Sequence, residues 1–247
     1  MRFLRLAATL WWALSVFALP AAADNFRLLV LDNAFVKWGE PVLGTGAVVT
    51  YGFATTETTN EDARNCKHMT AFADLAFSSK LPLDALKQEA RQAFGAWEDV
   101  SGLRFREADQ AESADILIGI QADPQGLAFT NVAPFKSSAA TSLLASLKKS
   151  LGLGMSNASR VDTIRQSLIC LNPLQTWKIG LDGNNKTYDV GYALTHEIGH
   201  AIGLDHPGAS GALMSFRYNE KIQGLQSGDI AAARTLYGPA DRNSSSP

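Results

Sequence analysis

Apolar residues recur with two different periods in the first half of this chain. Residues 48–53 place an aromatic or branched side chain at every second position, which is the period of a half-buried strand. Residues 82–100 instead repeat apolar side chains at every third or fourth position, which predicts one apolar face of a helix. Two more strands are expected at 103–105 and 115–120, and the second is so apolar that it should lie inside a sheet.

Three other stretches lack such a period. Residues 55–80 begin polar and irregular, and are interpreted as an insertion. Residues 134–165 are rich in Ser, Ala, Leu and Gly, with a candidate helix at 143–151; this stretch is either a lid over a cleft or, as we favour, a solvated insertion on its rim. Residues 182–185, Asp-Gly-Asn-Asn, predict a turn. Binding of Ca²⁺ by their oxygens is the less favoured alternative to a plain turn.

The first 23 residues have the composition of an export signal. Two arginines precede an apolar run at 6–19, and a small-residue cleavage site ends at Ala23. The run is shorter than the ~20 residues that a membrane span requires, so an uncleaved anchor is the less favoured alternative. We therefore expect a signal peptide at 1–23, one catalytic domain at 24–239 and a disordered tail at 240–247, in a protein that is secreted, extracellular or periplasmic.

Composition and charge exclude some classes of partner. Removal of the first 23 residues takes away two arginines and changes the formal charge from −2 to −4. The sequence has no stripe of Lys and Arg, so we do not expect it to bind nucleic acid. With 46% hydrophobic residues the chain can bury its own core, as one domain or a domain with two lobes. We expect a monomer that does not associate with a membrane after signal cleavage.

Three of the four histidines fall in one short run, His196-Glu197-Ile198-Gly199-His200-Ala201-Ile202-Gly203-Leu204-Asp205-His206. Residues four apart share one face of a helix, so His196 and His200 present two imidazoles to one point. Gly203 can adopt positive φ and turn the chain back, which brings His206 in as a third ligand. Three neutral imidazoles leave the fourth tetrahedral position open, as in catalytic zinc sites.

Glu197 is the candidate general base beside this site. Zinc lowers the pKa of water towards ~7, and a carboxylate within reach can accept its proton. A bare His-Glu-x-x-His occurs by chance in many helices and is weak evidence. The added Gly203 and His206, followed by Ala212-Leu213-Met214-Ser215, match the longer signature of proteases with a Met-turn.

With these residues, the chain resembles the metzincin zinc endopeptidases and, among them, the matrixins. The resemblance implies an α+β fold: a twisted mixed sheet, a first helix, an active-site helix, and a small C-terminal subdomain with the Met-turn and a final helix. It implies one catalytic Zn²⁺ held by His196, His200 and His206, with Met214 as a structural support beneath it. Residues 227–230, leading to Leu236-Tyr237-Gly238, resemble the final helix of that family.

The same resemblance suggests where a protein or peptide substrate would bind. Residues 125–129, which include Leu127 and Ala128, resemble the exposed strand that matrixin substrates join by main-chain pairing. Tyr192, one helical turn before His196, is expected to line the pocket beside the zinc. Phe216 and Tyr218 follow the Met-turn and are expected to form the rest of its wall.

Some residues depart from the matrixin pattern. Pro207 and the sequence Met214-Ser215-Phe216 resemble serralysins, but Phe216 lacks the phenol found there and no glycine-aspartate repeats follow. Only His68 lies outside the motif, so the structural zinc of matrixins is not expected here. We expect His68 to be a surface residue.

The two cysteines are expected to pair in an exported protein. A bond between Cys66 and Cys170 would close a loop of roughly 100 residues. The alternative is latency, in which a cysteine thiolate caps the zinc as in matrixin propeptides. The context of Cys66, Arg-Asn-Cys-Lys, does not resemble that motif.

Taken together, these residues predict a secreted zinc endopeptidase that cuts internal peptide bonds. Two alternatives stay open at this point. One is a zinc hydrolase that acts on cell-wall peptides or other non-protein peptides. The other is an inactive protease-like binding module, although Glu197 and the three histidines are intact.

Overall fold

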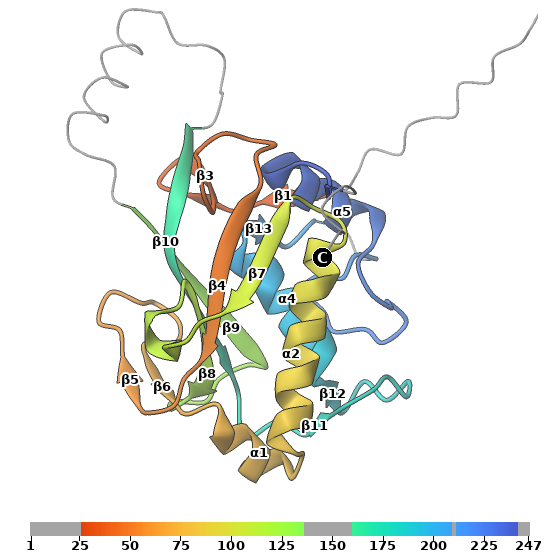
Figure 1. Cartoon of the computed structure of the whole chain (residues 1–247). Helices are drawn as coiled ribbons and strands as arrows, with labels where there is room; N and C mark the ends of the chain where they lie inside the picture. Colours follow the sequence, from red (N-terminus) through yellow and green to blue (C-terminus); the bar gives the residue numbers. More distant parts are fainter. Residues whose placement is uncertain (1–25, 136–159, 209–210, 242–247) are drawn as a thin grey trace, which may run out of the picture.

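The computed structural model describes residues 26–135, 160–208 and 211–241. The expected signal peptide, the candidate helix at 143–151 and most of the expected tail lie outside the described residues. The described chain forms one mixed sheet with its long helices on one face (Figure 1). This is the α+β arrangement that the resemblance implies, with a mixed sheet, a first long helix and a helix that carries the histidine motif.

Nine strands belong to the main sheet within the described residues. The order across it is β2-β3-β10-β8-β4-β7, with β9 and β6 attached to β10 and β8. The strands run β2 Val30–Leu31, β3 Ala34–Lys37, β4 Ala47–Phe53, β5 Thr58–Thr59, β6 His68–Thr70, β7 Leu103–Glu107, β8 Ile116–Gln121, β9 Ala128–Pro134 and β10 Arg160–Leu171. From β3 to β7 each strand in this order is parallel to the next, whereas β2 is antiparallel to β3 and β9 is antiparallel to β10.

The remaining elements are the helices and two small strand pairs. Strand β1 (Arg27–Leu28) pairs with β13 (Leu204–Asp205), and β11 (Trp177–Lys178) pairs with β12 (Tyr188–Asp189). The helices are α1 Ala73–Ser79, α2 Leu83–Glu98, η1 Ala111–Ser113, α4 Val190–Ala201 and α5 Ser227–Tyr237. Within the described residues, no helix has the length and apolar composition needed to cross a membrane.

Strand β8 is buried on both faces, which explains its continuous apolar sequence. Ile116, Ile118 and Ile120 point into the main core with α2 and α4, whereas Leu117 points into a second, smaller core. The smaller core lies on the opposite face of the sheet and also contains Met69 of the insertion. The first part of the insertion therefore covers the outer face of the sheet, whereas Phe72 and Leu75 near its end belong to the main core.

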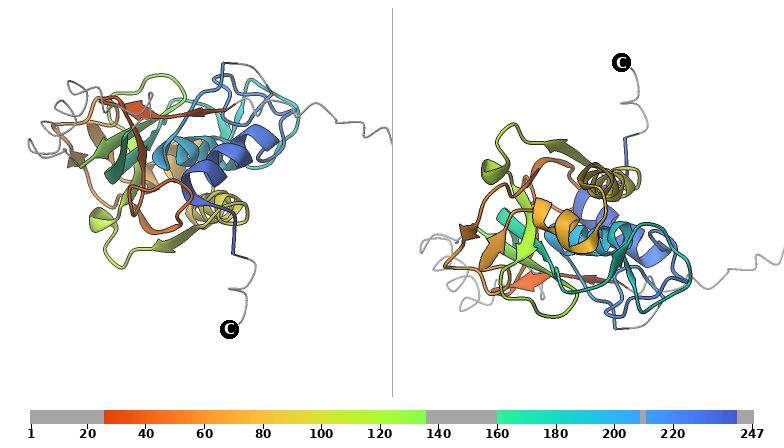
Figure 2. Two further views of the ribbon diagram at one scale, coloured as in Figure 1. Left: turned by 90° about the horizontal axis from the view of Figure 1, so that it is seen from above. Right: turned by 90° about the horizontal axis from the view of Figure 1, so that it is seen from below.

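The apolar face of α2 packs against both the sheet and α4. Phe94 stacks on Tyr51 of β4 with ring centroids 4.1 Å apart, and it also contacts Phe105 of β7. Trp97 donates from its indole Nε1 to the carbonyl oxygen of Thr195 in α4. This packing holds α4, the helix of the histidine motif, between α2 and the edge strand β9 (Figure 2).

Several sequence predictions need correction. The stretch at 134–165 is not wholly an insertion, because Pro134 ends β9 and residues 160–165 begin the long strand β10. Residues 55–80, interpreted as irregular, contain β5, β6 and α1. The three strands expected at 48–53, 103–105 and 115–120, and the helix at 82–100, are present as β4, β7, β8 and α2 with small shifts at their ends.

Candidate metal centre and catalytic cleft

The first turn of α4 is capped, which fixes where the helix begins and therefore which of its faces carries the histidine motif. The Asp189 side chain accepts from the Tyr192 amide at 2.6 Å, which satisfies one of the free amides of the first turn. After Ala201 the chain turns at Gly203, whose φ is +98°. A Cβ there would lie 2.1 Å from the carbonyl oxygen of Val36, so only glycine fits. The turn leads directly into β13 and His206.

The three histidines of the motif converge. The Nε2 atoms of His196, His200 and His206 lie 3.1 to 3.2 Å from one another. Within the described residues they form the only group of three or more potential ligands close enough to share one metal ion. His196 and His200 precede the turn at Gly203 and His206 follows it, as the motif predicts.

The Nδ1 atoms show which nitrogen carries the proton. Nδ1 of His196 lies 2.9 Å from the carbonyl oxygen of Leu213, and Nδ1 of His200 lies 2.9 Å from that of Leu204. A carbonyl oxygen only accepts, so each Nδ1 must donate, which leaves a lone pair on each Nε2. Lone pairs that face one another at such distances repel, unless a cation lies among them.

The electrostatics agree with neutral, metal-binding imidazoles. Burial, together with the other two histidines, holds the pKa of His200 well below its ordinary value. Burial and His196 also lower the pKa of His206. Imidazole nitrogens that share a tetrahedral zinc at about 2.0–2.1 Å are separated by roughly 3.3 Å. The three residues therefore fit a zinc ion.

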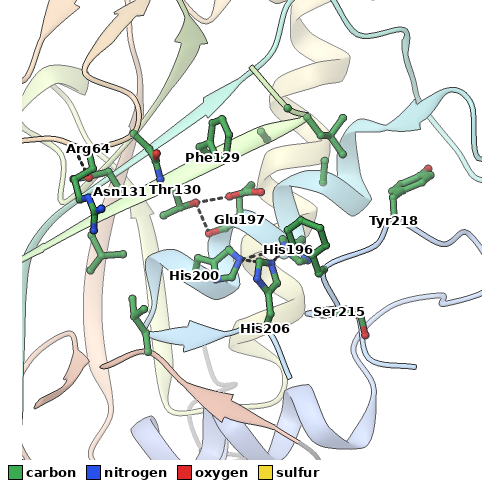
Figure 3. A pocket seen from close by; sticks show the side chains of 18 of the residues that line it. Arg64, Phe129, Thr130, Asn131, His196, Glu197, His200, His206, Ser215 and Tyr218 are labelled. Atoms are coloured by element: carbon green, nitrogen blue, oxygen red, sulfur yellow. Dashed lines mark hydrogen bonds between the residues drawn. The ribbon is translucent and has the colours of Figure 1, made fainter. Parts of the chain in front are cut away.

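Glu197 lies beside this centre on the same helix (Figure 3). Its Oε2 accepts from the hydroxyl Oγ1 of Thr130 on β9 at 2.7 Å, and the same oxygen of Thr130 lies 3.0 Å from the Glu197 carbonyl. Burial raises the pKa of Glu197, while His196 and the Thr130 hydroxyl oppose that rise. A buried carboxylate with a raised pKa suits a group that takes up and returns a proton.

The Met-turn forms the floor of the site. Met214 is buried, and a Cβ added at Gly199 would lie 2.2 Å from its sulfur, so α4 can approach the turn only because residue 199 is glycine. Asp229 of α5 accepts from the amides of Leu213 and Met214 at 2.8 and 3.1 Å. The final helix therefore fixes the carbonyl of Leu213, which orients His196.

A cleft of about 680 Å³ runs past the histidines. Its walls include all the residues that the sequence predicts for substrate binding, namely Tyr192, Phe216, Tyr218, Leu127 and Ala128. Tyr192 and Tyr218 meet edge to face with ring centroids 4.7 Å apart. Phe216 is 80% exposed and its ring lies 5.2 Å from that of His206. The residues are thus in place, and their role in binding remains a prediction.

A buried carboxylate that the sequence analysis missed holds one wall of this cleft. Glu220 accepts from the phenol of Tyr218 at 2.6 Å, and it also accepts from the amide of Asp182 and the ammonium of Lys178. Burial and this bond to Glu220 raise the pKa of Tyr218, so its phenol stays protonated. The oxygen of Tyr218 also accepts from the amide of Asp189, which begins α4. No periodic pattern in the sequence points to Glu220.

The oxygens of the turn at 182–185 are occupied by donors from the protein. Asp182 accepts from Lys178 and from the amide of Asn184. Asn184 and Asn185 accept from the amides of Lys186 and Glu220. The turn is therefore accounted for without an ion, and Ca²⁺ there stays an untested prediction.

The two cysteines are joined in a disulfide, with Cα atoms 5.6 Å apart. The bond connects the insertion to β10 on the outer face of the sheet. Cys66 is therefore not aimed at the histidines. His68 lies on β6, where its Nδ1 is 3.1 Å from the hydroxyl of Thr59.

Comparisons with known proteins agree with this geometry. The model of the matrixin peptidase family matches residues 65–238. The hatching enzyme of Paracentrotus lividus is 30% identical over 171 residues, which cover 66% of this chain and 24% of that protein. Metalloendoproteinase 1-MMP of Arabidopsis thaliana is 29% identical over 164 residues, with 64% and 40% covered. Interstitial collagenase B of Mus musculus is 27% identical over 184 residues, with 74% and 35% covered. The chain thus spans well under half the length of each of these relatives.

Proposed function

Because the chain belongs to the matrixin family of peptidases, we propose that it is a zinc-dependent endopeptidase that hydrolyses internal peptide bonds of proteins. The observation that carries the proposal is the convergence of three Nε2 atoms within 3.1 to 3.2 Å beside the buried carboxylate of Glu197. Two of the relatives are named as a metalloendoproteinase and a collagenase, which agrees with the proposal.

In the proposed reaction, His196, His200 and His206 hold the zinc. When bound, zinc supplies a Lewis acid that polarises the scissile carbonyl and lowers the pKa of water. Glu197 accepts a proton from the water as the oxygen of that water forms a bond to the carbonyl carbon. Glu197 then returns the proton to the amine nitrogen as the carbon–nitrogen bond breaks.

The surroundings of Glu197 support this role. Thr130 donates to Oε2, which fixes the carboxylate between β9 and α4. Among the described residues no hydrogen bond is recorded to Oε1, so that oxygen is available to a water molecule. Because the bond from Thr130 fixes the carboxylate, Oε1 of Glu197 stays within reach of the attacking water.

The edge strand β9 supports binding of an extended peptide. Among the described strands, β9 pairs only with β10, so its other edge is open towards the cleft. A substrate that adds a strand to this edge gains main-chain hydrogen bonds independent of its sequence. Side-chain pockets, in particular the one at Tyr192 and Tyr218, would then supply specificity on the carboxyl-terminal side of the scissile bond.

Secretion is part of the same proposal. The disulfide between Cys66 and Cys170 supports an oxidising compartment, because such bonds persist mainly in exported proteins. The expected signal peptide agrees with this.

The test is incubation of the purified chain with a library of peptides, with and without a zinc chelator, followed by mass-spectrometric identification of the cut sites. We expect internal cuts that the chelator abolishes and added zinc restores. Removal of single residues from chain ends, or cleavage of cell-wall peptides alone, would contradict the endopeptidase assignment. Absence of any cleavage by zinc-loaded protein would favour an inactive binding module.

A further inference from the structure

The loop between β5 and β6 is closed on itself and reaches the cleft. The amide of Asn60 donates to the carbonyl oxygen of Lys67 at 2.8 Å across the base of the loop. The ammonium of Lys67 lies 2.6 Å from a carboxylate oxygen of Glu61. Near the tip, Arg64 and Asn65 line the same cleft as the histidines.

Two bonds hold the tip of this loop against the sheet. The amide of Arg64 donates to the side-chain oxygen of Asn131 on β9 at 3.0 Å. Two residues later, Cys66 is bonded to Cys170, which lies opposite Phe129 in the register of β10 and β9. The main chain of Arg64 is therefore held at a fixed place over the strand that borders the cleft.

Arg64 also differs in charge from the rest of the cleft wall. Among the described residues that line the cleft, Arg64 is the only Lys or Arg and Glu197 is the only Asp or Glu. The side chain of Arg64 is exposed, and no acidic partner for its guanidinium is recorded in the described part of the chain. An exposed arginine without a partner, at a fixed position, can bind a carboxylate of another molecule in two-pronged geometry.

The position of Arg64 along the cleft determines which part of a peptide it would meet. Figure 3 shows Arg64 and Asn131 at one end of the cleft and Tyr218 at the other, with His196 and Glu197 between them. Side chains alternate along a strand, and Thr130 faces Glu197, so the neighbouring Asn131 faces the loop. A peptide paired with β9 would present every second side chain on that face.

We propose that Arg64 selects substrates with an acidic side chain on the amino-terminal side of the scissile bond. The proposal rests on the proposed function, which places the carboxyl-terminal side of the substrate at Tyr192 and Tyr218. It adds a substrate class to that function: peptides with Asp or Glu a few residues before an apolar residue at which cleavage occurs. The disulfide-anchored loop is the element that sets this choice.

The test uses fluorogenic peptides that share one cleavable sequence. They differ only in carrying Glu, Gln or Lys at the second or third position before the scissile bond, and kcat/KM is measured for each with the zinc-loaded enzyme. An exposed ion pair gives a few-fold preference, so we expect Glu over Lys by about three- to tenfold at one of these positions. The ratio should fall as NaCl is raised, because salt screens exposed charges.

Variants separate Arg64 from the general charge of the loop. Arg64→Ala should bring the Glu-to-Lys ratio close to one, and Arg64→Glu should reverse it. Lys67→Gln removes one positive charge from the same loop but not from the cleft wall, so it should keep the ratio of the wild type. Because each ratio compares two peptides on one variant, loss of folded protein does not alter it.

The two proposals fail in different ways. An active wild type with equal kcat/KM for the Glu and Lys peptides at both positions would overturn the role of Arg64 and leave the endopeptidase intact. A Glu preference that Arg64→Ala retains would also overturn it. A zinc-loaded wild type that cuts none of the peptides or the library would overturn the endopeptidase function, and the role of Arg64 with it.

Discussion

The hydroxyl of Thr130 on β9 donates to the carboxylate of Glu197 on α4 over 2.7 Å. This contact joins the strand on which a substrate would lie to the residue that would act as the base. It places the proton acceptor at a fixed distance from the edge of the sheet. Both the orientation of Glu197 and the alignment of a bound peptide thus depend on the same strand.

We therefore expect Thr130→Val, which keeps the shape but removes the hydroxyl, to lower kcat by about tenfold. A hydrogen bond to a charged group contributes roughly 1.5–3 kcal/mol, part of which water can replace. Thr130→Ser should keep most of the activity. Steady-state kinetics and zinc analysis of both variants check this, and a fully active Thr130→Val with normal zinc would refute the positioning role.

The residue just after the scissile bond should be apolar. Tyr192, Phe216 and Tyr218 give that part of the cleft neutral aromatic walls, and burial of a Leu-sized side chain there contributes ~1.5–3 kcal/mol. A charged side chain would lose water without gaining a partner. Cleavage before Leu, Ile, Met or Phe should exceed cleavage before Asp or Lys by roughly tenfold or more. Cut sites dominated by charged residues at this position would show that the pocket is assigned wrongly.

The purified protein should contain no free thiol, because Cys66 is bonded to Cys170 across a separation of 104 residues. Replacing both with serine should lower the free energy of unfolding by about 2–4 kcal/mol, since the bond restricts the unfolded chain. Thiol labelling of denatured, unreduced protein measures the first expectation and denaturant unfolding the second. Labelling of both cysteines in the wild type would disprove the bond.

Buried Lys37 should make stability depend on pH. Its ammonium donates to the carbonyl oxygens of Trp38 and Glu40 at 2.8 and 2.7 Å, and burial lowers its pKa from 10.5 to about 8. Between these two values the unfolded chain holds a proton that the folded chain has lost. The free energy of unfolding should therefore rise with pH from about 8 to 10.5, by on the order of 2–3 kcal/mol from this group.

Lys37→Met is the matched comparison, because it lacks the titrating group and retains much of the buried volume. Denaturant unfolding of both proteins at pH 7, 8, 9 and 10 gives the difference in stability between them. That difference should shift in favour of the wild type as the pH rises. Parallel curves over this range would rule out a lowered pKa for Lys37.

The sequence predicts the convergence of the three histidines because they lie within eleven positions and follow helical geometry. The spacing of His196 and His200 is a property of any helix, and Gly203 is required by the close approach of Val36. Strand β4, which has a regular period, and strand β8, which is a continuous apolar run, were also predicted. The interior position of β8 follows from its composition.

Other features depend on contacts between distant segments. Strand β10 was partly assigned to an insertion, because its first residues, from Arg160, are half-exposed and lack an apolar period. Thr130, Glu220 and Arg64 acquire their positions from partners on distant segments, namely Glu197, Asp182 and Asn131. A single sequence contains no signal for these pairings, since none of them lies within one turn or strand.

The measurement that tests the account most directly is the paired zinc content and activity of Glu197→Ala. The three imidazoles complete the metal site without this carboxylate, whereas proton transfer by such a base is typically worth 10²–10⁴-fold. The account predicts about one zinc per chain in the variant, as in the wild type, with peptide cleavage reduced by at least a hundredfold. A variant that binds zinc and cleaves as fast as the wild type would contradict it.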